Sequence, residues 1–317
     1  MFLNREFLDA CTQRTSLVIS LHKVQNQKFR KFCDSKALLI LGCLNFLRLL
    51  FLKKLKSNPK YELAVVAIVK NEGLYLEEWL KYYYSIGVGQ CYIYDNDSSD
   101  NTKQILKKYD DFVTYKKISG AKRQYDAYND ALNHYRKDCK LMAMIDGDEF
   151  IFCPPNNTKV IETISSYFKD KSIGGLGVNW EIFGSSHLEN KPDGLVTDNF
   201  VYRAENTFEK NKHIKTICDP NKVVGFINPH YATYLPGYKA INENGKVVTG
   251  AFTHYVSTNI IRVNHYFTKS KAEFVLKKAR GMADNLSIRN SNDFKMHDKN
   301  DVLDESMKKY NQLNGLD

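Results

Sequence analysis

Along residues 61–155, short apolar segments alternate with segments that carry apolar residues at helical spacing. The apolar segments have the length of buried strands and lie at 63–69, 91–94, 113–118 and 141–145. The intervening segments are expected helices, such as 124–135 and the one in which Leu76, Trp79, Leu80 and Tyr83 share a face. Strands that alternate with helices in this way predict an α/β fold with a mainly parallel sheet.

The pattern changes on both sides of this region. Further along the chain we expect a helix near 160–168, a strand near 175–179 and a helix near 271–283. The final residues are polar, whereas the first sixty are both basic and apolar. The sequence therefore divides into an arm at 1–60, a domain at 61–283 with halves that meet at residue 150, and a tail at 284–317.

The arm contains one long apolar run, at 37–52, which is interrupted only by Gly42, Asn45 and Arg48. As a helix this run would be about 24 Å long, whereas the hydrocarbon core of a bilayer is roughly 30 Å thick. We therefore expect a helix that lies in the membrane interface. A helix docked on the rest of the protein and a single span of a thin membrane are the alternatives.

Charge supports a membrane surface as partner. The chain has 46 Lys and Arg against 36 Asp and Glu, and 12 of the basic residues but only 3 of the acidic ones fall in the first 60. The arm thus carries +9 and the other residues +1, so no nucleic-acid partner is expected. The seven cysteines form no CxxC pair, which favours a reducing compartment. These features predict a peripheral protein at the cytoplasmic face of a membrane, with a single-pass protein as the alternative.

Acidic and amide side chains follow three of the expected strands. They are Asn71-Glu72, the cluster at 95–100, and Asp146-Gly147-Asp148. Because ligands bind beyond the carboxyl ends of parallel strands, these segments are expected to meet at one rim. An Asp-x-Asp pair suits a hard divalent cation, Mg²⁺ or Mn²⁺, that also binds phosphate oxygens.

Four segments within 65–148 carry a family resemblance: AIVKNEGLYLEEWLKYYYSIGV, YDNDSSDNT, RQYDAYNDAL and MIDGDEF. They resemble the nucleotide-sugar domain of GT-A glycosyltransferases and are most similar to the family 92 and family 2-like enzymes. The resemblance continues through WEIFGSS at 180–186 and NHYFTKS at 264–270, and covers roughly residues 62 to 310. It departs from the family pattern at His187, where Gly is usual.

The resemblance implies a GT-A fold whose first half, 61–150, binds the donor and whose second half, 151–283, binds the acceptor. It implies that Asp97 contacts the nucleoside and that Asp146 and Asp148 hold the ribose and the metal-diphosphate. A late histidine would complete the metal shell; we expect His265, with His254 and His230 as alternatives. The other expected donor-binding residues are Asn71, Glu72, Arg123, Gln124 and Lys269, with Lys215 and Lys277 as further candidates to neutralise the diphosphate.

The implied reaction is transfer of a hexose from a UDP-sugar to a glycan or lipid-linked acceptor, in surface polysaccharide or lipooligosaccharide synthesis. The resemblance further implies inversion at the anomeric carbon and UDP-galactose as the first donor to test. An inverting reaction needs a base for the acceptor hydroxyl, for which Glu181 and Asp198 are the candidates. A non-catalytic, membrane-attached module that binds nucleotide sugars or glycans is the main alternative, and an adaptor that binds nucleic acid is a third.

Overall fold

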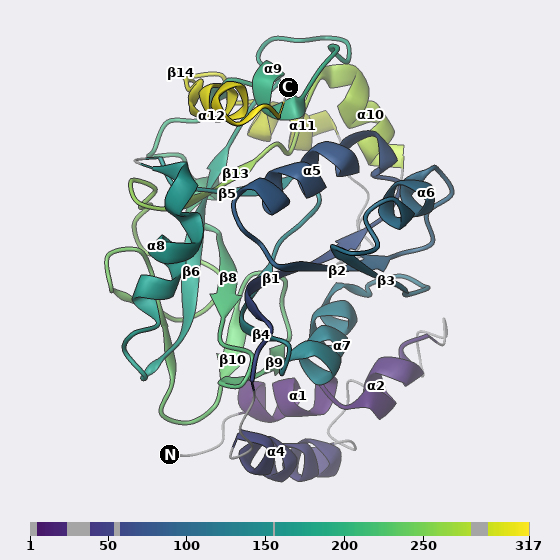
Figure 1. The fold of residues 1–317 in the computed structure, drawn as a ribbon, viewed down its shortest axis with the longest axis vertical. Coiled ribbons are helices and arrows are strands. Elements are labelled where there is room, and N and C mark those ends of the chain that lie inside the picture. Colours follow the sequence, from purple (N-terminus) through teal and green to yellow (C-terminus); the bar gives the residue numbers. More distant parts are fainter. Residues whose placement is uncertain (1–4, 24–38, 54–57, 155, 280–290, 317) are drawn as a thin grey trace.

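The computed structural model describes residues 5–23, 39–53, 58–154, 156–279 and 291–316. Helices cover both faces of a large central sheet (Figure 1). The helices are α1 (Arg5–Gln13), α2 (Ser16–Leu21), α4 (Leu39–Lys53), α5 (Gly73–Ser85), α6 (Thr102–Lys107), α7 (Gln124–Tyr135), α8 (Val160–Tyr167), α9 (Val196–Asn199), α10 (Lys271–Ala279), α11 (Ser291–His297) and α12 (Ser306–Asn314). The strands are β1 (Tyr61–Val69), β2 (Gln90–Asp95), β3 (Val113–Lys117), β4 (Cys139–Met144), β5 (Glu149–Phe152), β6 (Ile173–Ile182), β7 (Tyr202–Arg203), β8 (Ile214–Cys218), β9 (Val223–Phe226), β10 (Ala232–Tyr234), β11 (Lys239–Ile241), β12 (Val247–Val248), β13 (Arg262–His265) and β14 (Val302–Leu303).

The central sheet has the strand order β12-β11-β6-β8-β4-β1-β2-β3. Strands β4, β1, β2 and β3 form a group that is parallel throughout, in which β1 lies between β4 and β2. This arrangement confirms the predicted α/β fold with a mainly parallel sheet. Strand β8 is antiparallel to both β4 and β6, and β13 runs parallel to β6 and antiparallel to β5. The second half of the sheet is therefore mixed.

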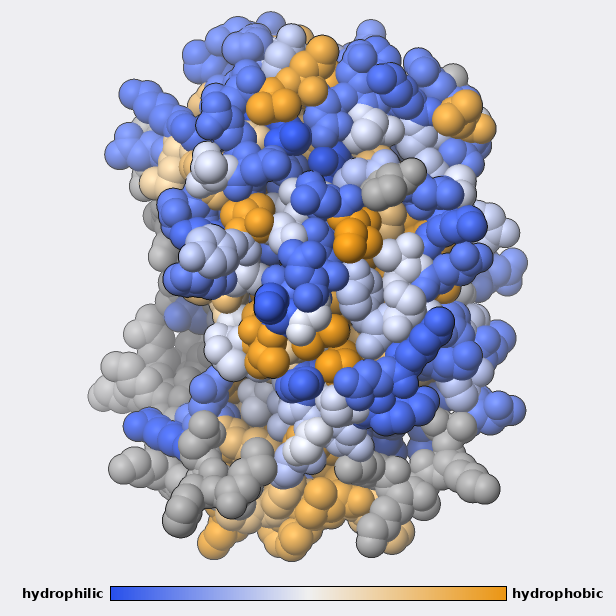
Figure 2. Space-filling view, turned by 90° about the vertical axis from the view of Figure 1, so that its left-hand side faces the viewer, coloured by the Kyte–Doolittle hydropathy of each residue, from blue (hydrophilic) through white to orange (hydrophobic). Residues whose placement is uncertain are grey.

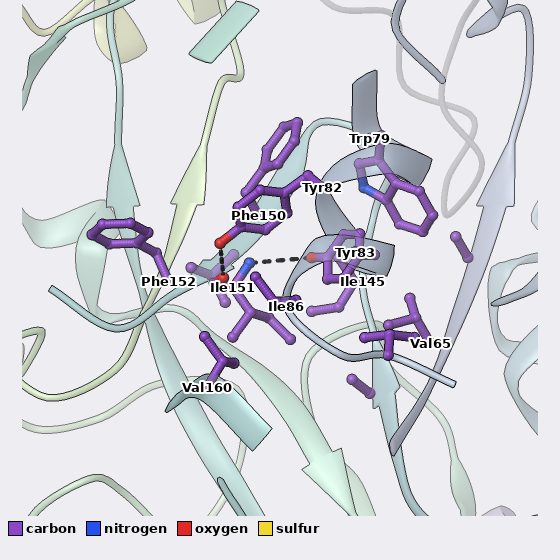
Figure 3. Packing of buried hydrophobic residues seen from close by; sticks show 14 of the residues in the cluster. Val65, Trp79, Tyr82, Tyr83, Ile86, Ile145, Phe150, Ile151, Phe152 and Val160 are labelled. Atoms are coloured by element: carbon purple, nitrogen blue, oxygen red, sulfur yellow. Dashed lines mark hydrogen bonds between the residues drawn. The ribbon is translucent and has the colours of Figure 1, made fainter. Parts of the chain in front are cut away.

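Side chains alternate between the two faces of the sheet, as the period of a strand requires. On β1, Leu63, Val65, Ala67 and Val69 pack against α5, α6 and α8, whereas Ala64, Val66 and Ile68 face α7. Figure 3 shows the first of these clusters, in which Trp79, Tyr82 and Tyr83 of α5 pack onto β1 and β5. Both faces are buried, which explains why the strands are continuous apolar runs.

The N-terminal arm packs against the α7 side of the sheet. Helix α1 contacts β9 and α7, and α4 lies beyond α1 at the end of the long axis of the molecule (Figure 1). The attachment depends on Arg14, whose side chain is buried and donates hydrogen bonds to the carbonyl oxygens of Leu132, Val223 and Val224 and to Asn133 Oδ1. The described part of the arm is therefore docked on the domain, as one of the alternatives predicted.

Helix α4 presents two different faces. One face packs on α1: Leu49 is buried, Asn45 donates to the Cys11 carbonyl oxygen at 2.8 Å, and a β-carbon at Gly42 would meet Thr12. The opposite face is apolar and exposed, with Ile40, Leu44, Leu47 and Phe51 between 61% and 73% exposed. Figure 2 shows apolar side chains gathered at this end of the molecule. Among the described helices, none is long and apolar enough to cross a membrane.

Residues 291–316 of the polar tail are ordered against the domain. Strand β14 pairs with β7, and Asp304 forms ion pairs with Arg203 at 3.0 Å and Arg262 at 2.8 Å. Helix α12 packs on α9 and buries Met307 and Tyr310. The part of the tail at 284–290 lies outside the described residues.

Candidate functional site

Three loops meet beyond the carboxyl ends of β1, β2 and β4. The Asn71 N–H donates to Ser98 Oγ at 2.9 Å, and Asn71 Oδ1 accepts from the Ser99 N–H at 2.7 Å. A β-carbon at Gly147 would lie 3.6 Å from Glu72 Cγ. The loops after β1, β2 and β4 are thus in contact, and the Asp146-Gly147-Asp148 segment lies at their junction.

Asp146 is held by groups from two different elements. Its Oδ1 accepts from Gln124 Nε2 at 2.8 Å and from the Tyr128 hydroxyl at 3.2 Å, so the start of α7 positions it. Its Oδ2 lies 2.8 Å from the ammonium of Lys215, which β8 inserts beside β4. Burial alone would lower the pKa of Lys215, but Asp146 and Glu149 hold that pKa well above its usual value. Lys215 therefore remains charged at the site.

Asp148 is buried and has two cationic or titratable neighbours. Its Oδ2 accepts from Lys277 Nζ of α10 at 2.5 Å, and its Oδ1 lies 3.6 Å from His265 Nε2 of β13. Burial would raise the pKa of Asp148, yet Lys277 and His265 hold it well below its usual range. Burial lowers the pKa of His265, against the effect of Asp148. Asp148 is therefore a carboxylate, and the imidazole beside it is predominantly neutral at pH 7.

A divalent cation fits this site through Asp148 and His265. Two ligands that each lie about 2.1 Å from one cation are roughly 3 Å apart, close to the 3.6 Å between Asp148 Oδ1 and His265 Nε2. No described group of three or more His, Cys, Asp or Glu side chains converges as a complete metal site. Lys215 and Lys277 contact the carboxylates of Asp146 and Asp148. Phosphate oxygens and water would have to supply the remaining ligands.

A cavity of about 340 Å³ opens next to Asp148 between the loop after β1 and helix α10. Its lining includes two lysines, of which Lys277 also binds Asp148 and Lys269 lies with its Nζ 4.1 Å from the centre of the Tyr75 ring. The full lining is Asn71, Leu74, Tyr75, Thr268, Lys269, Glu273, Leu276 and Lys277. The cavity thus joins the predicted Asn71 and Lys269 and offers positive charge to an anionic ligand.

Two predicted donor contacts have other partners in this structure. Asp97 accepts from Ser119 Oγ at 2.7 Å and from the Gly120 N–H at 3.1 Å; burial would raise its pKa, but these bonds lower it. Arg123 is fully buried, and its guanidinium donates to the Ile19 carbonyl oxygen and pairs with Asp126. Asp97 therefore orders the loop after β3, and Arg123 joins the arm to α7, while its neighbour Gln124 does reach Asp146.

The two candidate bases are hydrogen-bonded to side chains of the second half of the chain. Glu181 is buried on β6, where alternation directs it to the face opposite Trp180, the residue that contacts His265. Its carboxylate accepts from Asn211 Nδ2 at 2.9 Å and Thr258 Oγ1 at 3.1 Å. Asn211 and Thr258 therefore hold the Glu181 carboxylate in this structure, and its role as base stays a prediction.

Asp198 belongs to the short helix α9, and its Oδ1 accepts from Asn311 Nδ2 of α12 at 2.7 Å. It is therefore directed toward the C-terminal segment. Of the three candidate histidines, only His265 contacts Asp146 or Asp148 among the described residues. His230 packs against Trp180, and His254 is exposed beside Tyr255. 

Sequence reasoning missed two residues that organise the carboxylates. Glu149 is fully buried. Its Oε2 lies 3.3 Å from Lys215 Nζ and accepts a hydrogen bond of 2.9 Å from the Asp146 N–H. Burial raises its pKa, against the effect of Lys215. Tyr128 lies one helical turn after Gln124, so its hydroxyl reaches the same Asp146 oxygen. The position of Tyr128 one helical turn after Gln124 could have identified it from the sequence as a second contact of Asp146.

Comparison with known families gives a match over most of the domain. Residues 66–300 match the family model of glycosyltransferase family 92. A glycosyltransferase family 92 protein of Oryza sativa subsp. japonica is 29% identical over 209 residues, which are 65% of this chain and 33% of that protein. One of Arabidopsis thaliana is 26% identical over 172 residues, which are 51% of this chain and 30% of that protein. The chain therefore spans about a third of the length of the curated relatives it matches.

Solved structures share a smaller part of the fold. The match to TarS (1–349) of S. aureus in complex with UDP covers 50% of this chain and 47% of the TarS chain. Its TM-score is 0.34 and the sequence identity is 13%. Glucosyl-3-phosphoglycerate synthase of Mycobacterium tuberculosis, in complex with Mn²⁺, UDP and glucosyl-3-phosphoglycerate, covers 38% of this chain and 44% of its own, with a TM-score of 0.29 and 15% identity. At these scores no binding site is transferred from either structure.

Proposed function

The chain belongs to glycosyltransferase family 92, as its motifs predicted, and on this premise we propose that it transfers a hexose from a UDP-sugar to an acceptor hydroxyl. The observation that carries the proposal is the contact of Asp148 with His265 and Lys277 at the rim where the loops after β1, β2 and β4 meet. UDP-galactose is the first donor to test, and the reaction inverts the anomeric carbon. The acceptor is a glycan or a lipid-linked saccharide of a surface polysaccharide or lipooligosaccharide.

The lysines of the site suit a leaving group that develops negative charge. Lys269 and Lys277 line the cavity beside Asp148, and their ammonium groups would stabilise the diphosphate as the bond to the sugar breaks. Mn²⁺ or Mg²⁺, held by Asp148 and His265 with Asp146 nearby, would supply further positive charge to the same oxygens. Gln124 and Tyr128 keep Asp146 oriented during this step.

Release of UDP from a panel of UDP-sugars, with Mn²⁺ or with EDTA, tests the proposal. We expect hydrolysis that depends on the metal and falls at least about 100-fold in Asp148→Ala, because one charged group at the reacting diphosphate contributes several kcal/mol. Asp111→Ala removes an exposed carboxylate and serves as the matched control. Equal rates in both variants would refute the role of Asp148, and nucleotide binding without turnover under any condition would favour the non-catalytic module.

We further propose that the exposed face of α4 rests on an anionic membrane at the cytoplasmic side. Ile40, Leu44, Leu47 and Phe51 recur with the spacing of one helical face, and the opposite face is already occupied by α1. The +9 charge of residues 1–60 complements anionic lipid headgroups. The six described cysteines are free, in keeping with a reducing compartment. A peripheral protein held in this way would meet a lipid-linked acceptor at its own surface.

Cosedimentation with vesicles of phosphatidylglycerol and phosphatidylcholine tests this placement. In Leu44→Glu/Leu47→Glu we expect binding to weaken at least about tenfold. Each of these leucines, when it is buried in the lipid, would contribute roughly 1 kcal/mol or more to membrane binding. Leu313→Glu changes an exposed leucine of α12 and controls for added charge. Unchanged binding in the double variant, or a wild-type dimer that the double variant dissociates, would overturn the membrane assignment.

A further inference from the structure

A row of aromatic rings in contact runs from the carboxylate site to the protein surface. His265, which neighbours Asp148, lies with its ring centre 4.4 Å from that of Trp180. Trp180 stacks on His213 at 4.7 Å and 19°, and His213 contacts Phe252 at 4.4 Å. Trp180 is 8% exposed and Phe252 is 56% exposed, so the row begins beside Asp148 and ends in solvent.

The histidines in and beside the row have a fixed hydrogen-bonding edge. His213 Nδ1 lies 3.0 Å from the Lys210 carbonyl oxygen, and His230 Nδ1 lies 3.0 Å from that of Ile214. Because a carbonyl oxygen only accepts, each Nδ1 carries the hydrogen and each Nε2 keeps a lone pair. Burial lowers the pKa of His213 to about 4, so this neutral form holds at pH 7. The Nε2 atoms can therefore accept hydrogen bonds.

Trp180 adds a donor at the inner end of the row. Its Nε1–H is buried and has no hydrogen-bond partner among the described residues. A buried indole N–H normally finds an acceptor, so this one points to a group that binds there. The ring of His230 lies 5.1 Å from that of Trp180 and 5.1 Å from that of His213, which places its acceptor edge in the same cluster.

Saccharides match this combination of groups. The C–H face of a pyranose packs on aromatic rings, and its hydroxyls both donate and accept hydrogen bonds. A row formed for packing alone would be expected to be apolar and enclosed. This row contains two histidines, has His230 beside it, and ends at an exposed phenylalanine. A nucleotide is a poorer match, because burial lowers the pKa of the histidines and leaves the rings of the row uncharged toward phosphates at pH 7.

We propose that Trp180, His213, His230 and Phe252 form the subsite for the acceptor saccharide, which enters past Phe252 and presents its hydroxyl near Asp148. The inference rests on the proposed transferase function. It names the acceptor class as a saccharide of at least two residues, because the rings extend beyond the space that one sugar covers. The outer sugar stacks on Phe252, and the inner one extends toward the Trp180 end of the row.

Saturation-transfer NMR and calorimetry with cellotetraose, chitotetraose and β-1,4-galactotetraose test the subsite. We expect one or more of these to bind the wild type, and binding to weaken roughly 3- to 10-fold in Phe252→Ala, the effect of one aromatic contact. His213→Phe keeps the ring but removes Nε2, and is expected to weaken binding while it preserves the stack. Tyr84→Ala, which removes an exposed tyrosine at the far end of α5, is the matched control.

Hydrolysis of UDP-sugar without acceptor separates this inference from the proposed function. Tyr84→Ala, which changes a residue outside the row, is expected to hydrolyse the donor at the wild-type rate. If no UDP-sugar is hydrolysed by the wild type while a tetrasaccharide still binds at Phe252, the donor proposal fails and the subsite stands. If no tetrasaccharide binds, or if Phe252→Ala and His213→Phe bind as the wild type does, the subsite is refuted.

Discussion

Replacement of Arg14 by alanine tests whether the N-terminal arm is part of the folded domain. The side chain is 1% exposed and makes four hydrogen bonds, to neutral oxygens of α7 and β9. Each bond contributes about 1 kcal/mol, and three carbonyl oxygens would be left buried without this donor. Burial lowers the pKa of Arg14 to about 9, which records a desolvation cost that the alanine variant avoids. The expected net loss is roughly 3 kcal/mol.

Urea unfolding followed by circular dichroism measures this loss as a shift of the midpoint at an unchanged slope. Arg5→Ala removes an arginine of the same arm whose side chain is 74% exposed, and is expected to change the free energy of unfolding by less than about 0.5 kcal/mol. Limited proteolysis should cleave the arm of Arg14→Ala sooner than that of Arg5→Ala. Equal midpoints for the two variants would refute the conclusion that Arg14 anchors the arm.

Three further predictions concern the second half of the chain. Glu181→Ala should lower the melting temperature, because Asn211 and Thr258 lose their buried partner. The kcat/KM of the folded variant should fall less than about tenfold. A thousandfold loss of kcat at an unchanged melting temperature would instead support Glu181 as the base. Gly184→Ala should lower the free energy of unfolding by roughly 2–4 kcal/mol, since its β-carbon would lie 2.3 Å from the Lys299 carbonyl oxygen. An unchanged melting temperature would show that the backbone around Lys299 moves to make room for the β-carbon. Burial would raise the pKa of Asp304, but Arg262 lowers it to about 2. The ionised Asp304 therefore stabilises the folded protein by roughly 1–2 kcal/mol. This contribution is complete above pH 4 and disappears as the pH falls through 2. This acid-dependent loss of melting temperature should be absent in Asp304→Asn.

The sequence predicted those parts of the fold in which each element shows its own pattern. Helix α7 has the predicted bounds, because its buried residues recur at helical spacing and Gln124 begins it directly. Strands β1, β2 and β4 are apolar runs, since both faces of a parallel sheet are covered. The rim beyond their carboxyl ends was predicted from the three polar segments that follow these strands, Asn71-Glu72, 95–100 and Asp146-Gly147-Asp148.

Long-range pairing limited the prediction of the remaining elements and contacts. Strand β8 has the sequence IKTIC, in which Lys215 breaks the apolar run because it pairs with carboxylates of another strand. Arg123 looked like a donor contact from its position, but the partner that buries it, Ile19, is 104 residues away. The ring row was equally invisible, because Trp180, His213 and Phe252 are brought together only by β6 and the loops around β8.

The antiparallel insertion of β8 also determines how this protein can be divided in the laboratory. Residues 214–218 occupy the hydrogen-bonding edge of β4, although the two strands are about seventy residues apart along the chain. A fragment that ends after β5 would expose that edge together with the buried carboxylates of Asp146 and Glu149, whose counter-ion lies on β8. Unpaired edges of this kind recruit strands from other molecules and lead to aggregation. Donor-binding fragments for biophysical work should therefore extend at least through β8.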